Sequence, residues 1–293
     1  MKACYAIEII TPKKILLRGL WFGPKRPKQV LVWVHGLGSS MFSMQTLATN
    51  FVDTKTAVLM FNNRGHDKIS RLARANEKKI KKTHLAGAAH EVFTDCVDDI
   101  QGAVNFAKRQ GVKNMYLAGH STGCQKAIYW ASRNPPAGGG GRGVKGIILL
   151  GAVSDLAAGT KLQGKQKIAR TAAVARSLVA RGKRHQLLPP GLWHEVLDAQ
   201  RFLSLYTPDG VEEIFSYTQP TKNARTLKSV RIPVLVLWAE KEEFSNQPAR
   251  EVGEWFKKHT QKGKIIILPR TGHLFRGAER RVVREVRQWM KKH

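Results

Sequence analysis

The chain has 293 residues, 42% of them hydrophobic, and carries 50 Lys and Arg against 21 Asp and Glu, a net charge of +29. This length and apolar content predict one large α/β domain, with or without an insertion, and argue against a string of small modules. Three cysteines are too few for a disulfide framework and match no zinc spacing, and no apolar run approaches the roughly 20 residues of a membrane-spanning helix. We expect a cytoplasmic protein with no membrane span.

Short apolar runs alternate with helical patterns, which is typical of a mainly parallel sheet covered by helices on both faces. Residues 3–10 and 14–22 predict an opening pair of strands. Residues 29–36 predict a buried strand that ends in His-Gly, and a helix is expected near 41–51. Residues 56–65 predict another buried strand. The alternating N-terminus therefore predicts a strand and not a signal peptide.

The middle of the chain continues the alternation after a polar, basic segment at 67–82. A helix is predicted over 91–109, where acidic first turns and a basic last turn match the helix dipole. Residues 114–121 predict a strand that leads directly into a helix over 124–133. A glycine-rich loop at 134–143 precedes the next strand, which we place at residues 144–153.

Regular alternation stops after this strand, where the chain becomes helical and basic. The sheet pattern returns with strands at 233–240 and 264–270, and the chain closes with a helix from about residue 278. We therefore predict an α/β core formed by 1–155 and 233–293 and a helical cap insertion over 156–232.

The pentapeptide Gly-His-Ser-Thr-Gly at 119–123 lies between a predicted strand and a predicted helix. Such a turn is so tight that the flanking residues must be small, and it lifts the serine hydroxyl above the edge of the sheet. The start of the helix also provides free N–H groups where an oxyanion would form. In this context the motif predicts that Ser121 is a nucleophile and not an ordinary turn serine.

A serine nucleophile needs a histidine base and an acid that orients it. His273 follows the last strand in a glycine-flanked loop at the same sheet edge, whereas His120 would point the other way on the turn. The order serine, acid, histidine is the one that this type of fold uses. Glu242, in the loop after the strand at 233–240, is the predicted acid, and Asp155 is the alternative.

The oxyanion hole is expected to consist of backbone N–H groups. One donor is Thr122, directly after the serine. The other comes from the His-Gly-Leu-Gly loop at 35–38, where we select Leu37; an ordinary strand-to-helix turn is the alternative for this loop.

Five segments occur in the order and spacing of a known family: HGLG, NNRG, GHSTG, WAEKEEF and TGHLF. On these segments the chain resembles the α/β-hydrolase superfamily over nearly its whole length. The longer phrase GHSTGCQ, with RFLSLYTPDG and IFSY in the insertion, is similar to a narrower branch that includes archaeal esterases and fungal siderophore esterases of the fusarinine type.

The resemblance implies a serine hydrolase that acts through an acyl-enzyme, with Ser121 as nucleophile, His273 as base and Glu242 as orienting acid. Relatives commonly have Gly and Asp where this chain has Ala239 and Glu242. We expect a carboxylic-ester hydrolase that needs no metal or organic cofactor. An amidase, a peptidase or an acyltransferase would use the same residues.

The insertion carries 13 basic against five acidic residues, together with several aromatic ones. This composition favours a small-molecule ester that is anionic or aromatic, although aromatic residues at such spacing are more often the insertion's own core. The rival hypothesis is a non-catalytic protein that binds nucleic acid or an anionic surface through its charge. No nucleic-acid-binding motif supports it, and the charge is spread over most of the chain.

Overall fold

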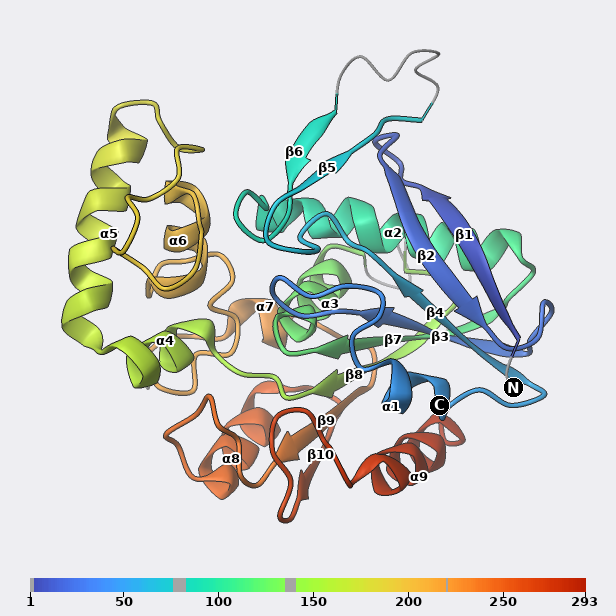
Figure 1. The fold of residues 1–293 in the computed structure, drawn as a ribbon. Helices are drawn as coiled ribbons and strands as arrows, with labels where there is room; N and C mark the ends of the chain where they lie inside the picture. Colours follow the sequence, from blue (N-terminus) through green and yellow to red (C-terminus); the bar gives the residue numbers. More distant parts are fainter. Residues whose placement is uncertain (1–2, 76–82, 135–140, 220) are drawn as a thin grey trace.

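The computed structural model describes residues 3–75, 83–134, 141–219 and 221–293 (Figure 1). Within these residues, eight strands form one sheet in the order β1-β2-β4-β3-β7-β8-β9-β10. The β1–β2 and β2–β4 pairs are antiparallel and the other pairs are parallel, so the predicted mostly parallel sheet is confirmed. The strands are β1 (Cys4–Ile10), β2 (Leu16–Phe22), β3 (Gln29–Val34), β4 (Thr56–Phe61), β7 (Asn114–His120), β8 (Val144–Leu150), β9 (Val234–Ala239) and β10 (Gly263–Leu268).

A second sheet consists of two short antiparallel strands, β5 (Ser70–Leu72) and β6 (His84–Ala86). β5 lies inside the basic segment predicted at 67–82 and β6 follows it; residues 76–82 of the segment lie outside the described part of the chain. Residues 135–140 of the predicted glycine-rich loop lie outside it as well.

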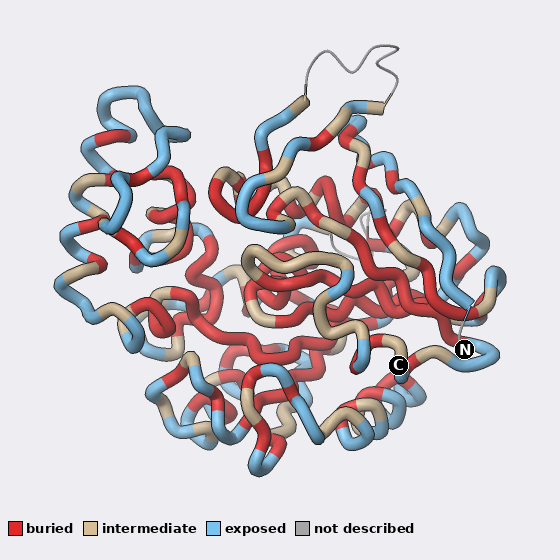
Figure 2. Tube along the Cα trace, in the orientation of Figure 1, coloured by how far each residue is buried: buried red, intermediate tan, exposed pale blue. Residues whose placement is uncertain are grey.

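The inner strands of the large sheet are buried on both faces (Figure 2). Every residue of β4 and β9 is buried, and apart from Thr56 both strands are wholly apolar. A continuous apolar run is what a strand covered on two sides requires. The edge strand β1 is mostly exposed instead.

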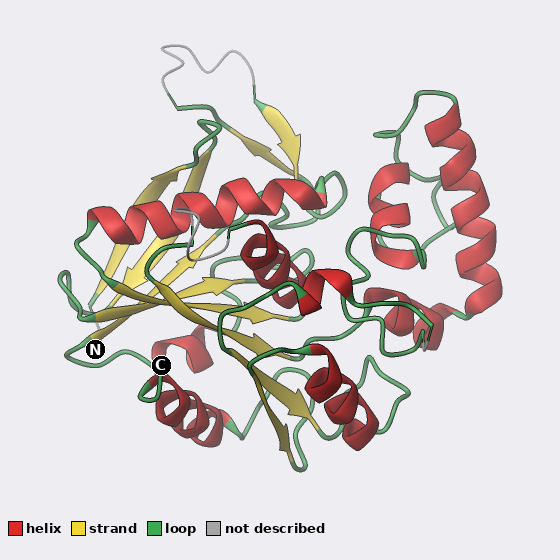
Figure 3. Cartoon of the chain, turned by 180° about the vertical axis from the view of Figure 1, so that it is seen from behind, coloured by secondary structure: helices red, strands yellow, loops and turns green. Residues whose placement is uncertain are grey.

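Helices cover both faces of the sheet (Figures 1 and 3). Apart from the chain between β8 and β9, side chains of three helices join the apolar core on one face, and side chains of two helices join the core on the other. No helix within the described ranges is long and apolar enough to cross a membrane. The first group is α2 (Cys96–Arg109), α3 (Thr122–Arg133) and α8 (Ala249–His259); the second is α1 (Gln45–Thr49) and α9 (Glu279–Met290).

The chain between β8 and β9 forms four helices among its described residues: α4 (Asp155–Gln163), α5 (Lys165–Ala180), α6 (Ala199–Tyr206) and α7 (Arg225–Lys228). Helices α5 and α6 share a separate apolar cluster in which Trp193 packs edge-on against Phe202 at 5.0 Å. Phe215 and Leu227 instead join the main core. The insertion therefore has one part with its own core and one part built into the α/β body.

A buried ion cluster joins this insertion to the helix that follows Ser121. Glu91 lies between Lys126 of α3, at 2.6 Å, and Arg201 of α6, at 2.8 Å. Arg201 also pairs with Glu212. All four side chains are fully buried. Burial raises the pKa of Glu91, but the two cations outweigh burial and bring this pKa below its ordinary value.

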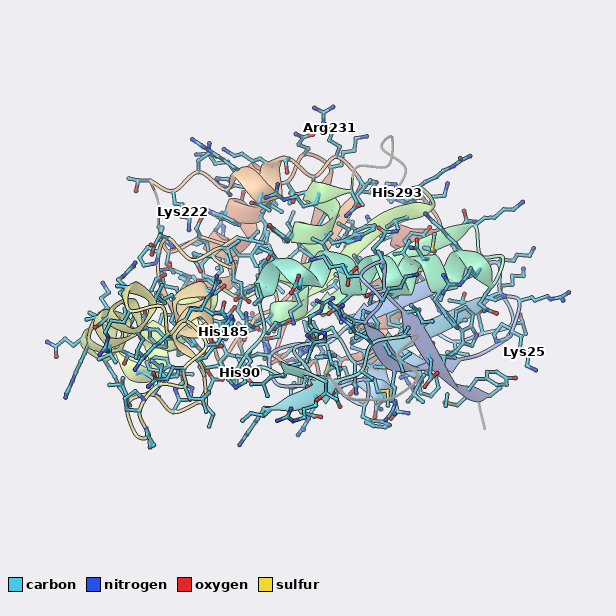
Figure 4. All side chains as sticks on the ribbon, turned by 90° about the horizontal axis from the view of Figure 1, so that it is seen from above. Lys25, His90, His185, Lys222, Arg231 and His293 are labelled. Atoms are coloured by element: carbon cyan, nitrogen blue, oxygen red, sulfur yellow. The ribbon has the colours of Figure 1, made fainter. Side chains whose placement is uncertain are left out.

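Further contacts anchor α6 on the same part of the body. The backbone N–H of Asp198 donates to the carbonyl of Ala89 at 2.8 Å, and the guanidinium of Arg201 donates to that of Ala88 at 3.2 Å. Nδ1 of His90 and Nδ1 of His185 lie 3.1 and 3.0 Å from one oxygen of Asp198. Figure 4 shows these two histidines close together where the insertion meets the body.

Candidate active site

Ser121 lies in the turn between β7 and α3, with φ 54° and ψ −128°. Residues other than glycine adopt a positive φ at a cost in free energy, so the surrounding structure must hold this turn in place. The two glycines of the motif make the turn sterically feasible. A Cβ at Gly119 would overlap the carbonyl oxygen of Gly123, and a Cβ at Gly123 would overlap that of Val34. Glycine is therefore required at both positions, because the turn at Ser121 packs its backbone directly against neighbouring backbone atoms.

The loop after β3 lies against the serine. A Cβ at Gly36 would come within 3.0 Å of Cβ of Ser121. Among the described residues, no hydrogen bond engages the backbone N–H of Leu37 or of Thr122. Both N–H groups are thus unengaged among these residues; Leu37 lines the same cavity as Ser121, and Thr122 directly follows the serine.

His273 and Glu242 are brought together at the same sheet edge. Both carboxylate oxygens of Glu242 lie 2.9 Å from Nδ1 of His273, and both side chains are buried. Glu242 follows β9 and His273 follows β10, the parallel strand paired with β9. Because parallel strands end at the same edge, their following loops meet there. This leaves Nε2 as the free nitrogen of the ring.

The loop of His273 is fixed by two neighbours of Glu242. The carboxylate of Glu243 accepts the backbone N–H of His273 at 2.6 Å. The ring of Phe244 packs edge-on against the imidazole, with ring centres 4.8 Å apart. Two adjacent glutamates therefore hold the histidine in different ways, one through its ring and one through its backbone.

His120 contacts His273, a contact that the sequence analysis missed. Their ring centres lie 4.8 Å apart, and Nε2 of His120 donates to the backbone carbonyl of His273 at 3.1 Å. Burial lowers the pKa of His120 to about 3, so this ring is neutral at neutral pH. The residue before the serine therefore supports the histidine, and nothing in the local sequence indicates this.

Gly151 is a second residue without a sequence signal. It follows β8 with φ 61°, and a Cβ there would lie 2.9 Å from two atoms of the His273 ring. Asp155, the alternative acid, has no bond with His273 among the described residues. One of its oxygens accepts the side-chain amide of Gln125 at 2.8 Å instead. Burial and the charge of Glu212 raise the pKa of Asp155 well above its ordinary range.

One cavity of about 510 Å³ unites these groups. Its lining includes Leu37, Ser121, Asp155, His273 and, from the insertion, Tyr206. No group of three or more His, Cys, Asp or Glu in the described ranges could hold a metal ion. Of the predicted site residues, Leu37, Ser121, Asp155 and His273 thus line one space, whereas Glu242 and Thr122 are not among its lining residues.

The comparisons with known proteins agree with this fold. Residues 88–293 match a family model described as "Protein of unknown function (DUF1749)". No curated protein matches the chain significantly.

Several solved structures share the architecture at low sequence identity. The α/β hydrolase GrgF from Penicillium sp. sh18 has 15% identity and a TM-score of 0.67, over 99% of this chain and 99% of that chain. The siderophore hydrolase EstB from Aspergillus fumigatus has 17% identity and a TM-score of 0.63, over 98% of each chain. The esterase Pf2001 from Pyrococcus furiosus has 16% identity and a TM-score of 0.59, over 99% of this chain and 91% of that chain.

The predicted resemblance to α/β hydrolases, fungal siderophore and archaeal esterases among them, is thereby confirmed at the level of the fold. The family match covers more than half of the chain. The chain belongs to the DUF1749 family and has the α/β-hydrolase fold.

Proposed function

We propose that the protein is a serine hydrolase of carboxylic esters with Ser121, His273 and Glu242 as its catalytic triad. The observation that carries the proposal is the strained turn that presents Ser121 to the cavity lined by His273, whose Nδ1 lies 2.9 Å from Glu242. Esterases among the structural neighbours favour the same chemistry.

In this mechanism Oγ of Ser121 attacks the acyl carbonyl while Nε2 of His273 removes its proton. The negative charge of Glu242 stabilises the imidazolium that forms. The proton passes to the leaving alcohol, and an acyl-enzyme remains. Water activated by His273 then attacks this ester, and the acid leaves as Ser121 regains its proton.

The tetrahedral oxyanion is stabilised by the free N–H groups of Leu37 and Thr122. Thr122 is the first residue of α3, so the positive end of the helix adds to this stabilisation. His120 acts as a positioning residue. Its neutral ring packs against His273 and donates to the carbonyl of that residue, which restrains the base.

The insertion at 156–232 serves as a cap that shapes the acyl or alcohol pocket. Asp155, the residue before it, and Tyr206 of α6 line the same cavity as Ser121 and His273. An amidase, peptidase or acyltransferase would use the same triad. A panel of esters and matched amides, assayed with and without an added alcohol acceptor, separates these activities.

A fluorophosphonate probe tests the proposal directly, since it labels an activated serine without depending on the natural substrate. We expect wild type to be labelled and to hydrolyse short-chain p-nitrophenyl esters, and Ser121→Ala to do neither. Ser229→Ala, at an exposed position far along the chain, is the matched control and should behave as wild type. A folded wild-type protein without labelling or turnover would favour the non-catalytic binder.

A further inference from the structure

The cavity beside Ser121 differs in charge from the rest of the molecule. The chain has a net charge of +29, and basic side chains such as Lys25 and Arg231 lie at its periphery (Figure 4). Yet the described residues that line this cavity include no Lys or Arg. They include three acidic residues: Asp155, Glu195 and Glu243. The local environment of the serine is therefore acidic inside a basic protein.

None of these three carboxylates is paired with Lys or Arg among the described residues. Glu195 accepts the hydroxyl of Tyr206 at 2.5 Å, and Glu243 accepts a backbone N–H. Nε2 of His194 lies 3.9 Å from Glu195 and would pair with it only when protonated. The lining carboxylates thus form no ion pair with Lys or Arg in the described ranges, although the charge of Arg201 acts on Asp155 and offsets part of the effect of burial on its pKa.

Asp155 is the most buried of the three, with 8% of its surface exposed. One oxygen accepts the amide of Gln125, and the other accepts no hydrogen bond among the described residues. Gln125 lies four residues after Ser121, on the helix that starts at the serine turn. Asp155 and Ser121 line the same cavity, so a ligand bound beside the serine lies in the space that Asp155 faces.

A buried carboxyl group without a cation is unfavourable in its ionised form, and a ligand cation placed beside it would restore a pair. The same group offers no positive charge to a carboxylate. The raised pKa of Asp155 has this cause, because burial and neighbouring acids disfavour its negative charge. An incoming ammonium group would favour that charge and would displace the proton.

We propose that the protein prefers esters that carry an ammonium group close to the scissile carbonyl, as in α-aminoacyl esters, and that Asp155 contacts this group. The inference rests on the proposed function, since it names the substrate class of the same site. It differs from the expectation of an anionic ester, which relied on the net charge of the whole insertion.

Three ethyl esters of nearly equal size test the inference: those of alanine, isobutyric acid and methylmalonic acid, the last as its monoester. They place an ammonium, a methyl and a carboxylate group, respectively, on the same carbon. Titration of the released acid at constant pH gives kcat/KM for each. We expect the alanine ester to exceed the isobutyrate by about tenfold or more, and the carboxylate ester to be the poorest.

Asp155→Asn keeps an oxygen for the amide of Gln125 but removes the charge. We expect the ratio of kcat/KM between the alanine and isobutyrate esters to fall towards one. Asp209→Asn is the matched control, because it removes one acidic charge from an exposed position of the insertion that pairs with Arg176. This variant should keep the wild-type ratio. Fluorophosphonate titration of active sites corrects each protein for misfolded material.

The outcomes separate the two proposals. Equal rates for the three esters, or a preference for the carboxylate ester, would overturn the ammonium preference while leaving the Ser121 mechanism intact. An ammonium preference that persists in Asp155→Asn would overturn the assignment to Asp155. Loss of all ester turnover together with loss of probe labelling in wild type would instead contradict the hydrolase proposal itself.

Discussion

Replacing Gly151 by alanine would displace the proposed catalytic base without replacing any residue of the triad. The new Cβ would lie 2.9 Å from two atoms of the His273 ring, whereas a comfortable contact is about 3.5 Å or more. The ring must therefore move by roughly 0.6 Å or more. That movement disturbs the contact of Nδ1 with Glu242 and the reach of Nε2 to Ser121.

A displacement of about 1 Å at a reacting group costs on the order of 100-fold in rate. We expect Gly151→Ala to lower kcat by this order, with a smaller change in KM, because the cavity that binds the ester is otherwise unchanged. The rate of fluorophosphonate labelling should fall in parallel. The positive φ of 61° adds a strain of about 1 kcal/mol, which appears as reduced thermal stability.

Gly182→Ala is the control that separates the effect of backbone strain from the effect of displacing the His273 ring. Gly182 has φ 74°, and a Cβ there would meet no atom within 4 Å. This variant should lose a similar amount of stability and keep its kcat. A folded Gly151→Ala protein with a wild-type kcat would refute the reasoning, as would an equal loss of kcat in both variants.

Three further substitutions test other groups. Glu242→Gln retains the shape of the acid but not its charge, so kcat should fall by on the order of 10³-fold or more, and a loss of less than about tenfold would argue against the assignment. Burial raises the pKa of Glu213 from 4.5 to about 7, so its contribution to stability is complete below pH 4.5 and is lost as the pH rises through 7, a total of about 3 kcal/mol. The gain in melting temperature of Glu213→Gln over wild type should therefore be absent below pH 4.5, grow as the pH rises to 7 and persist above it; a difference independent of pH would contradict this. Lys126→Met leaves Glu91 with one cation fewer and should lower the free energy of unfolding, measured with urea, by about 3–5 kcal/mol. The double variant with Glu91→Gln should lose less free energy of unfolding than the sum of the two single variants.

The sheet was predictable from the sequence because its inner strands are continuous apolar runs, and such runs suit strands that are covered on both faces. The turn at Ser121 was predictable for a similar local reason, since the motif glycines lie where the strand meets the helix. The order of these signals along the chain also favoured the fold.

Features formed by distant residues could not be predicted in this way. Glu242 and Glu243 are adjacent in one loop, and only the three-dimensional structure assigns one to the ring of His273 and the other to its backbone. The contacts of His120 and Gly151 with the same ring depend on neighbouring strands. The charge of the cavity depends on which side chains line it, and the composition of a segment does not tell which of its side chains do so.

The buried cluster of Glu91, Lys126 and Arg201 restrains the movement of α6 relative to the α/β body. A hinged opening of α6 would separate Arg201 from Glu91 and expose charges that are now fully buried. The backbone bond between Asp198 and Ala89 would break as well. In the proposed mechanism, substrates would therefore enter and products leave without a movement of α6. Opening of α6 should then not limit turnover, and the width of the cavity mouth beside α6 would restrict substrate size.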